Sequence, residues 1–203
     1  VHVERKCRGV PARVLVRDPK SRSTVRARIA EFVNGMCAAT VKTHAVDEEF
    51  FATHYRSKFQ SIGAVETELT QDLSLIESAM STLAHGRTMA TVRIHGDLTV
   101  NNVFFDPTSL ALTGLIDWET SLLGSMPFDL IHYLIAERRE LDPQPWGALV
   151  ASALAGSLFD AEARALLLTH LETLGLKEAH LIPLLVGYWV RGVALRQGLS
   201  GGQ

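Results

Sequence analysis

Cysteines and long apolar runs are both scarce in this chain. Cys7 and Cys37 are the two cysteines among 203 residues, and they form neither a C-x-x-C pair nor a metal-binding pattern. Isolated cysteines suit a reducing compartment, so we expect a cytoplasmic location. The longest strongly apolar run, residues 181–190, is ten residues long, whereas a membrane span needs roughly 20 apolar residues. It predicts a buried helix and no membrane partner, and the polar, basic start predicts no secretory signal.

The chain also lacks a large excess of charge of either sign. Its net charge is −2 and 47% of its residues are apolar, which is ordinary for a globular protein. The charge is unevenly spread, because residues 1–30 hold nine Lys or Arg against Glu4 and Asp18. A basic end can attract nucleic acid, but no aromatic pattern for base stacking accompanies it. We favour a solvated strand and turn, and we do not expect a nucleic-acid partner.

Helical spacing of apolar residues dominates the chain. The clearest stripe lies between residues 65 and 83, where apolar side chains are alternately four and three positions apart. Asp47 and Asp160 are placed as helix caps, and Gly86 and Gly175 as C-terminal stops. Helices are accordingly expected from residue 23 onward and over residues 47–59, 65–83, 127–139, 145–155, 160–174 and 177–197.

Short β-like segments interrupt this helical pattern. Residues 12–17 alternate loosely before Asp18-Pro19, which is typical of a strand followed by a turn. A small β insert follows later, with a hairpin loop expected at Asp106-Pro107. Its order between two helical regions predicts an α+β fold, and polar residues concentrate in it. The expected strands of the insert are residues 92–94, 103–105 and 112–116.

The β insert contains the pattern H-x-D-x-x-x-x-N. It is formed by His95-Gly96-Asp97 and, five residues later, by Asn102. This is the spacing of the kinase catalytic loop, with Gly in place of Arg. Phosphoryl transfer needs a carboxylate to orient the acceptor hydroxyl and an amide oxygen that binds Mg²⁺ without adding negative charge. A lone His-Gly-Asp is most often a simple turn, so the offset of Asn102 is the informative feature.

A second acidic position follows an apolar run fifteen residues after Asn102. Asp117 ends the run Gly114-Leu115-Ile116 and precedes Trp118. This corresponds in place and form to the kinase Asp-Phe-Gly motif, whose aspartate binds magnesium. A carboxylate at a strand end can reach Mg²⁺ held between nucleotide phosphates.

Together these motifs resemble the aminoglycoside phosphotransferase and choline kinase family, which has a protein-kinase-like fold. Members commonly read H-G-D-x-x-x-x-N, then an apolar strand ending in I-D-[FW], then a Gly and a D-L pair at the start of the next helix. Four linked matches in this order are far more specific than one short motif. The matching residues are His95-Gly96-Asp97 with Asn102, Ile116-Asp117-Trp118, Gly124 and Phe128-Asp129-Leu130.

The resemblance implies a protein-kinase-like fold, of which this chain is mainly the helix-rich C-terminal lobe with a β-hairpin insert carrying the catalytic loop. It implies transfer of the γ-phosphoryl group of ATP or GTP to a hydroxyl of an aminoglycoside, choline, sugar or similar small molecule. On the matching positions, Asp97 is the catalytic base and His95 braces its loop. Asn102 and Asp117 bind Mg²⁺ and, through it, the nucleotide. Asp129 supports the loop by hydrogen bonds without touching substrate.

The resemblance does not extend to a nucleotide-binding lobe. No glycine-rich loop and no V-A-I-K-type strand precede His95, so we expect that lobe in an upstream segment of the full-length protein or in a partner chain. Arg17 is a candidate counterpart of the phosphate-binding lysine, with Glu31 as its partner. Leu98-Thr99-Val100-Asn101 replaces the common Leu-His-Pro-Gly, which leaves the turn of this loop open. Because Asn101 adjoins Asn102, both stay candidates for the ligand amide. We divide the chain into a basic strand and turn (remnant of the nucleotide lobe or hinge) at 1–22, a helical catalytic lobe at 23–197 and a flexible tail at 198–203.

Other functions stay open from the sequence. The main alternative is a catalytically inactive, kinase-like module with a binding or regulatory role. His95, Asp97 and Asp117 also resemble part of a metallohydrolase cluster, but the other histidines lie on predicted helices without H-x-x-x-H spacing. Nucleic-acid binding rests on the basic start of the chain alone.

Some residues of the later helices are interpreted from their neighbours. We place His132 in the core as a hydrogen-bonded residue, and we interpret residues 137–140 as a solvated helix end. Tyr188 and Trp189 are core residues or, with Arg191, the lining of an acceptor pocket. The acidic balance after residue 30 is consistent with an acidic pocket that binds a cationic acceptor, but a sugar, an amino acid or a homoserine-like acceptor fits equally.

Overall fold

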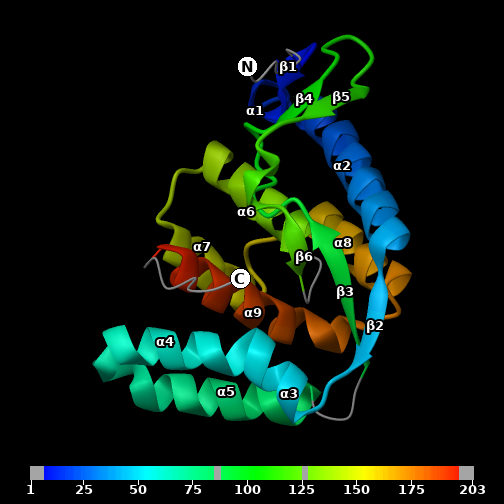
Figure 1. Cartoon of the computed structure of the whole chain (residues 1–203). Helices are drawn as coiled ribbons and strands as arrows, with labels where there is room; N and C mark the ends of the chain where they lie inside the picture. The colour runs from blue at the N-terminus through cyan, green and yellow to red at the C-terminus, as the bar shows by residue number, and fades with distance from the viewer. Residues whose placement is uncertain (1–6, 85–87, 125–127, 197–203) are drawn as a thin grey trace, which may run out of the picture.

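The computed structural model describes residues 7–84, 88–124 and 128–196 and shows a mixed helical and β fold (Figure 1). Helices predominate, and the strands form two small antiparallel sheets, which confirms the predicted α+β fold. The helices are α1 (Ala12–Leu15), α2 (Pro19–Thr40), α3 (Glu48–Phe51), α4 (Ser57–Val65), α5 (Thr70–Ala84), α6 (Phe128–Leu141), α7 (Trp146–Leu154), α8 (Ala161–Thr173) and α9 (Leu181–Arg196). The strands are β1 (Val10–Pro11), β2 (Lys42–Ala45), β3 (Thr88–Ile94), β4 (Val103–Phe105), β5 (Leu112–Leu115) and β6 (Leu122–Gly124).

Besides the connection from β1 to β2 through α1 and α2, two short crossings of the chain join the two sheets. One sheet has the strand order β1-β4-β5 and the other β2-β3-β6, with antiparallel neighbours in both. The chain passes from β3 to β4 through residues 95–102 and returns from β5 to β6 through residues 116–121. Figure 1 shows β1, β4 and β5 with α1 at one end of the molecule, and β3 and β6 beside the helices. Both sequence motifs therefore lie where the chain crosses between the sheets.

The helices surround a continuous apolar core. Helix α2 packs on α6 and α8, while α4 packs on α5 and α9. Leu130 and Leu134 of α6 and Leu184 and Leu185 of α9 are buried in it. Among the helices of the described residues, none is long and apolar enough to cross a membrane.

Most predicted helices and their caps are confirmed. Asp47 accepts a hydrogen bond from the Phe50 N–H, and Asp160 accepts one from the Ala163 N–H, each over 2.8 Å. Gly175 ends α8 with a φ of +71°, the left-handed conformation that its position predicted. Gly86 and the predicted tail at 198–203 lie outside the described residues.

The strand predicted at residues 12–17 is wrong, because this segment is the helix α1. Ala12 and Val16, four positions apart, have no exposed surface, whereas Val14 between them is exposed. Burial therefore follows the helical repeat rather than alternation. Asp18-Pro19 begins α2 instead of making a turn, since the Asp18 side chain accepts from the Ser21 N–H over 2.8 Å. The pair Asp-Pro occurs both in turns and at the start of helices, where Asp is the cap and Pro the first helical residue, so the pair alone does not distinguish the two.

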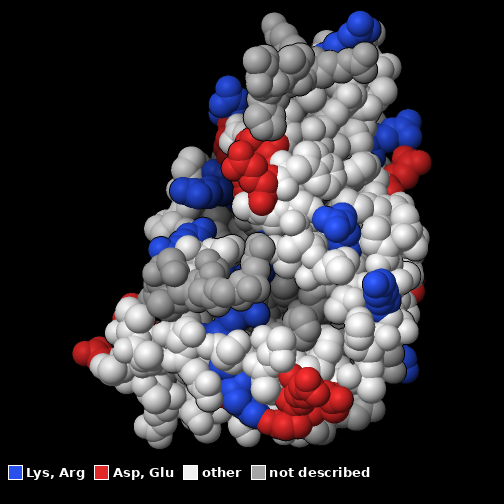
Figure 2. All heavy atoms as spheres, in the orientation of Figure 1, with Lys and Arg blue, Asp and Glu red and all other residues white. Residues whose placement is uncertain are grey.

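Basic residues near the start of the chain are paired with acidic residues of later helices. Arg26 of α2 contacts Glu137 of α6, and Asp160 and Glu162 at the start of α8, over 2.6–3.0 Å. Glu137 is buried, so the solvated helix end predicted at 137–140 is wrong for this residue. In the face shown in Figure 2, Lys and Arg of the described residues occur in separate groups between uncharged side chains. Arg26 therefore holds α2 against α6 and α8, and the face in Figure 2 carries no continuous basic surface among the described residues.

His170 of α8 makes stability depend on pH. Its Nδ1–H donates to Asn34, and its buried Nε2 has no hydrogen-bond partner among the described residues. Burial lowers the pKa of His170 from 6.5 to about 4. Below pH 6.5 the unfolded chain therefore binds a proton that the folded chain excludes until about pH 4. We expect stability to fall across this window by about 3 kcal/mol, at ~1.4 kcal/mol per pH unit.

The variant His170→Gln tests this expectation. Gln keeps a donor for Asn34 and cannot titrate. The variant should therefore lose less stability between pH 6.5 and 4 than the unchanged protein, by most of the expected ~3 kcal/mol. Urea unfolding at pH 7, 5.5 and 4.5 measures the difference. If the free energy of unfolding falls with pH equally in both proteins, His170 binds its proton in the folded state as easily as in the unfolded one.

Candidate active site

The two crossings lie side by side and are hydrogen-bonded to each other. The Ile116 N–H donates to the Asn102 carbonyl over 3.0 Å, which extends the pairing of β4 with β5. His95 Nε2–H donates to the Ile116 carbonyl over 2.8 Å, and the Thr120 hydroxyl donates to the His95 carbonyl over 3.1 Å. Trp118 covers the buried His95 ring, with ring centroids 4.5 Å apart. The loop of the first motif and the segment after β5 therefore form one unit, and His95 acts in it by positioning.

Gly96 and Asp129 fix the backbone of the loop. Gly96 has a φ of +88°, and a Cβ at this position would lie 2.4 Å from the Thr120 carbonyl oxygen. This explains why Gly stands where protein kinases have Arg. Asp129, at the start of α6, accepts hydrogen bonds from the His95 N–H over 2.7 Å and from the Gly96 N–H over 3.0 Å. Burial raises the pKa of Asp129, while these two N–H groups lower it.

Asp97 presents a carboxylate whose two oxygens both have a donor. Its Oδ1 lies 3.2 Å from His132 Nε2, and its Oδ2 accepts from Asn102 Nδ2 over 2.9 Å. The hydrogen bond from His132 lowers the pKa of Asp97 despite partial burial. The side chain is still 46% exposed, so an ionised, oriented carboxylate is open to a ligand.

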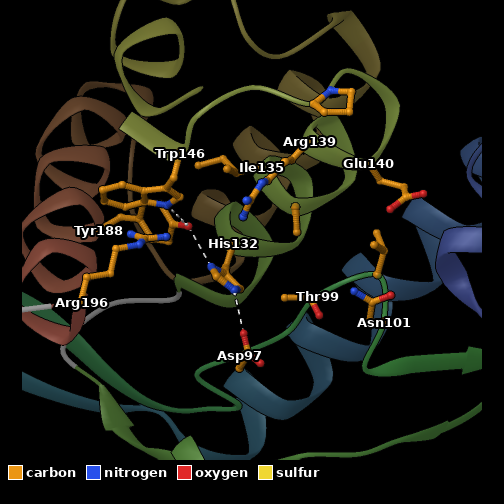
Figure 3. A pocket seen from close by; sticks show the side chains of 13 residues that line it. Asp97, Thr99, Asn101, His132, Ile135, Arg139, Glu140, Trp146, Tyr188 and Arg196 are labelled. Atoms are coloured by element: carbon orange, nitrogen blue, oxygen red, sulfur yellow. Dashed lines mark hydrogen bonds and ion pairs between the residues drawn. The ribbon is translucent and has the colours of Figure 1, made fainter. Parts of the chain in front are cut away.

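His132 belongs to this site: it is hydrogen-bonded, as predicted, but it is partly exposed and contacts Asp97, so its placement in the core is wrong. It lies on α6 three residues after Asp129, with Nδ1 2.8 Å from the Tyr188 hydroxyl, which accepts from Trp146 Nε1–H over 3.3 Å. In the neutral His132 ring with its proton on Nε2, Nε2–H donates to Asp97 and the Tyr188 hydroxyl donates to Nδ1, so the hydrogen bonds run in one direction from Trp146 to Asp97 (Figure 3). The sequence signal was the three-residue spacing from Asp129, which places both side chains on one helix face.

A cavity of about 410 Å³ opens beside Asp97. This size is typical of sites for small molecules, roughly 300–1,000 Å³. Its charged side chains are two acidic (Asp97, Glu140) and two basic (Arg139, Arg196), so this cavity is not an acidic pocket. The polar and aromatic residues that line it are Asp97, Thr99, Asn101, His132, Arg139, Glu140, Trp146, Tyr188 and Arg196.

Three residues considered for an acceptor pocket have different places. Tyr188 lines the cavity beside Asp97. Trp189 packs against the core, and Arg191 lines a separate cavity of about 170 Å³ next to β6. Tyr188 and Trp189 are therefore core residues, as one of the two interpretations had it, and of the three residues Tyr188 alone also lines this cavity.

Asn102 and Asp117 lie at the same end of the β4–β5 hairpin. Asn102 Nδ2 donates to the Asp97 carbonyl and carboxylate, each over 2.9 Å, and no described group donates to its amide oxygen. Asp117 is exposed, with a φ of +62°. One amide oxygen and one carboxylate fit Mg²⁺ whose other ligands are waters and nucleotide phosphates. Asn101 instead lines the cavity beside Asp97, which favours Asn102 as the ligand amide.

Two alternative assignments are not supported by the geometry. The described residues contain no group of three His, Cys, Asp or Glu placed to hold a metal ion by themselves, as a metallohydrolase requires. The pairing proposed between Arg17 and Glu31 is wrong, because Arg17 contacts Glu140 over 2.6 Å and Glu31 contacts Arg28 over 3.0 Å.

Asp129→Ala is expected to lower both the melting temperature and any activity that depends on the loop. The substitution leaves the buried His95 N–H without an acceptor, at roughly 1–3 kcal/mol, and the partly buried Gly96 N–H likewise at a smaller cost. Asp129→Asn keeps one acceptor oxygen and should give an intermediate effect. Thermal unfolding of both variants measures this. An unchanged melting temperature with abolished activity would instead assign Asp129 to substrate contact.

Comparison with known proteins agrees with this geometry. The model of the phosphotransferase enzyme family matches residues 7–167, which include both crossings, all of α6 and most of α8. No curated protein matches the chain. The match covers well over half of the 203 residues and confirms the resemblance drawn from the motifs. The chain belongs to the phosphotransferase enzyme family.

Proposed function

We propose that this protein is a small-molecule kinase with a protein-kinase-like fold, which transfers the γ-phosphoryl group of ATP or GTP to a hydroxyl group. The observation that carries the proposal is the arrangement around Asp97. Its carboxylate is held by two donors, opens on a cavity, and neighbours Asn102 and the Asp117 segment. Phosphoryl transfer requires a carboxylate at the acceptor hydroxyl next to the cation site.

In the proposed reaction, Asp97 accepts a hydrogen bond from the acceptor hydroxyl and orients its oxygen. That oxygen forms a bond to the γ-phosphorus while the bond between the γ-phosphorus and the bridging oxygen breaks. The nucleoside diphosphate leaves, and the hydroxyl proton passes to Asp97. A lowered pKa makes Asp97 a weak base, which suits a reaction that depends mainly on positioning and charge stabilisation. His132 and Asn102 hold the carboxylate in place.

Asn102 and Asp117 would hold Mg²⁺ together with the nucleotide phosphates. When bound, the ion neutralises phosphate charge. The two side chains alone are too few ligands for a tight magnesium site, because Mg²⁺ demands six ligands and dehydrates reluctantly. We therefore expect metal and nucleotide to bind together.

We further propose that a separate lobe contributes to nucleotide binding. No glycine-rich hairpin is present in residues 7–84, and Arg17 is engaged with Glu140. An upstream segment of the full-length protein or a partner chain would then clamp the nucleotide against the crossings. In that case the 203-residue chain binds Mg-ATP weakly, and Asp117→Ala removes the metal-dependent part of binding by the full-length protein.

The test is ATP or GTP consumption by the full-length protein with amino-sugar, sugar, hydroxy acid and choline acceptors. Turnover that requires an acceptor, with the phosphorylated product identified by mass spectrometry, supports the proposal. Nucleotide binding without turnover on any acceptor would favour the inactive, kinase-like module.

A further inference from the structure

Two arginines of the cavity beside Asp97 have no carboxylate partner among the described residues. They are Arg139 of α6 and Arg196 of α9. The neighbouring Arg138 differs, because it is paired with Asp142 over 3.1 Å. In Figure 3 the guanidinium groups of Arg139 and Arg196 both point toward the region between Trp146 and His132.

The acidic side chains of the cavity do not neutralise these arginines. Glu140 is paired with Arg17 over 2.6 Å, so its charge is balanced from outside the cavity. Asp97 is held by His132 and Asn102 at the site of transfer. Burial lowers the pKa of Arg196, and the like charge of Arg139 lowers it further. Both arginines are exposed at the same cavity and have no carboxylate partner among the described residues, so an anion that enters the cavity can pair with them.

The aromatic wall of the cavity is already occupied by a cation. The Arg196 guanidinium lies 3.8 Å from the centroid of the Trp146 ring. A quaternary ammonium or amino-sugar acceptor would have to displace Arg196 from this ring face, or bind against Arg139 and Arg196. The cavity therefore disfavours the cationic acceptor that the overall charge balance suggested.

The position of the cavity separates it from the expected metal site. Asn102 and Asp117 do not line it, whereas Asp97 does. It therefore lies on the acceptor side of Asp97. The hydrogen-bonded series of His132, Tyr188 and Trp146 leads along its wall from Asp97 toward Arg196.

We propose that the phosphoryl acceptor carries an acidic group, a carboxylate or a phosphate ester, in addition to its hydroxyl, and that Arg139 and Arg196 bind this group. The inference rests on the proposed function, because it names the acceptor class of the same site. A hydroxyl and an acidic group on one small molecule match the two ends of the cavity. The planar forks of the arginines suit two-point binding of carboxylate or phosphate.

The first experiment compares acceptors that differ in the acidic group alone. Full-length protein is assayed with gluconate against glucose, glycerate against glycerol, and glycerol 3-phosphate against glycerol, with choline as the cationic probe. We expect kcat/KM for an acidic member to exceed that of its neutral partner about tenfold or more. Equal or better turnover of the neutral or cationic acceptors would overturn the inference and leave the proposed function intact.

The second experiment changes the arginines. Arg139→Gln and Arg196→Gln should each raise KM for the acidic acceptor about tenfold or more with little change in kcat, because the contact is made equally in ground and transition states. Arg196→Lys keeps the charge and should recover part of the loss. Arg138→Gln removes a neighbouring arginine outside the cavity and should change neither parameter.

Direct binding decides the inference if no acceptor is turned over. Gluconate, glycerol 3-phosphate and inorganic phosphate are titrated into the protein while tryptophan fluorescence is recorded, since Trp146 lies in the cavity wall. Saturable binding that both Arg→Gln substitutions weaken supports an anion site at these residues. Absence of saturable binding by all three probes, or binding unaffected by the substitutions, overturns it.

Discussion

Asp97→Asn is expected to lower kcat of the full-length protein by at least about 10²-fold while the fold is retained. The amide cannot take up the proton of the acceptor hydroxyl, and general-base contributions are typically ~10²–10⁴. The carboxylate is half-exposed and lies in a loop whose backbone is held by Asp129. Replacement by a side chain of the same size should therefore leave thermal unfolding nearly unchanged.

The control for this prediction is Asp72→Asn. Asp72 is an exposed aspartate of α5 that lines none of the cavities near Asp97. It should keep the kcat of the unchanged protein, which shows that loss of one negative charge is not itself harmful. Near-normal kcat for Asp97→Asn, with native thermal stability, would remove Asp97 from the role of catalytic base.

The positions in the site that follow from the sequence are those set by neighbouring residues of the chain. The β4–β5 hairpin is short, so the residues just outside its strands, Asn102 and Asp117, must lie at one end. Gly96 is demanded by a positive φ and by the close approach of Thr120. These are local requirements, and local sequence carries them.

The parts that the sequence did not predict depend on contacts between distant segments. His132 joins the site because α9 brings Tyr188 to one of its nitrogens and the catalytic loop brings Asp97 to the other. Strands β2 and β6 were missed since they are short, and β2 is exposed along its whole length. Their pairing with β3 creates them. Glu137 was assigned to solvent because its partner, Arg26, lies 111 positions away.

The arrangement of Arg26 and Glu137 leads to the largest expected change in stability. The two side chains are 7% and 1% exposed and meet over 2.6 Å between Nη2 and Oε1. Arg26→Met leaves the Glu137 carboxylate buried without its partner. Breaking a buried pair in this way costs about 3–5 kcal/mol, a large share of the ~5–15 kcal/mol that keeps a typical domain folded.

The matched double variant separates the ion pair from the packing of the helices. Arg26→Met with Glu137→Met replaces both charges by apolar side chains, which is often neutral or stabilising. We expect it to recover most of the stability lost in Arg26→Met. Asp160→Asn and Glu162→Gln should each cost less than about 1 kcal/mol, because the side chains of Asp160 and Glu162 are about half exposed and stay in contact with water. Denaturant unfolding of the single and double variants gives the coupling free energy.

The pH dependence of Arg26→Met gives an independent check. Burial raises the pKa of Glu137, and Arg26 opposes that rise. Without Arg26, the pKa of Glu137 in the folded state is higher still. Above pH 4.5, the ordinary pKa of this carboxyl, the folded variant therefore holds a proton on Glu137 that the unfolded chain has released. Its deficit relative to the unchanged protein should shrink as pH falls from 7 toward 5. A deficit that is constant with pH, or a double variant as unstable as the single one, would show that Arg26 stabilises the fold by packing and not by neutralising Glu137.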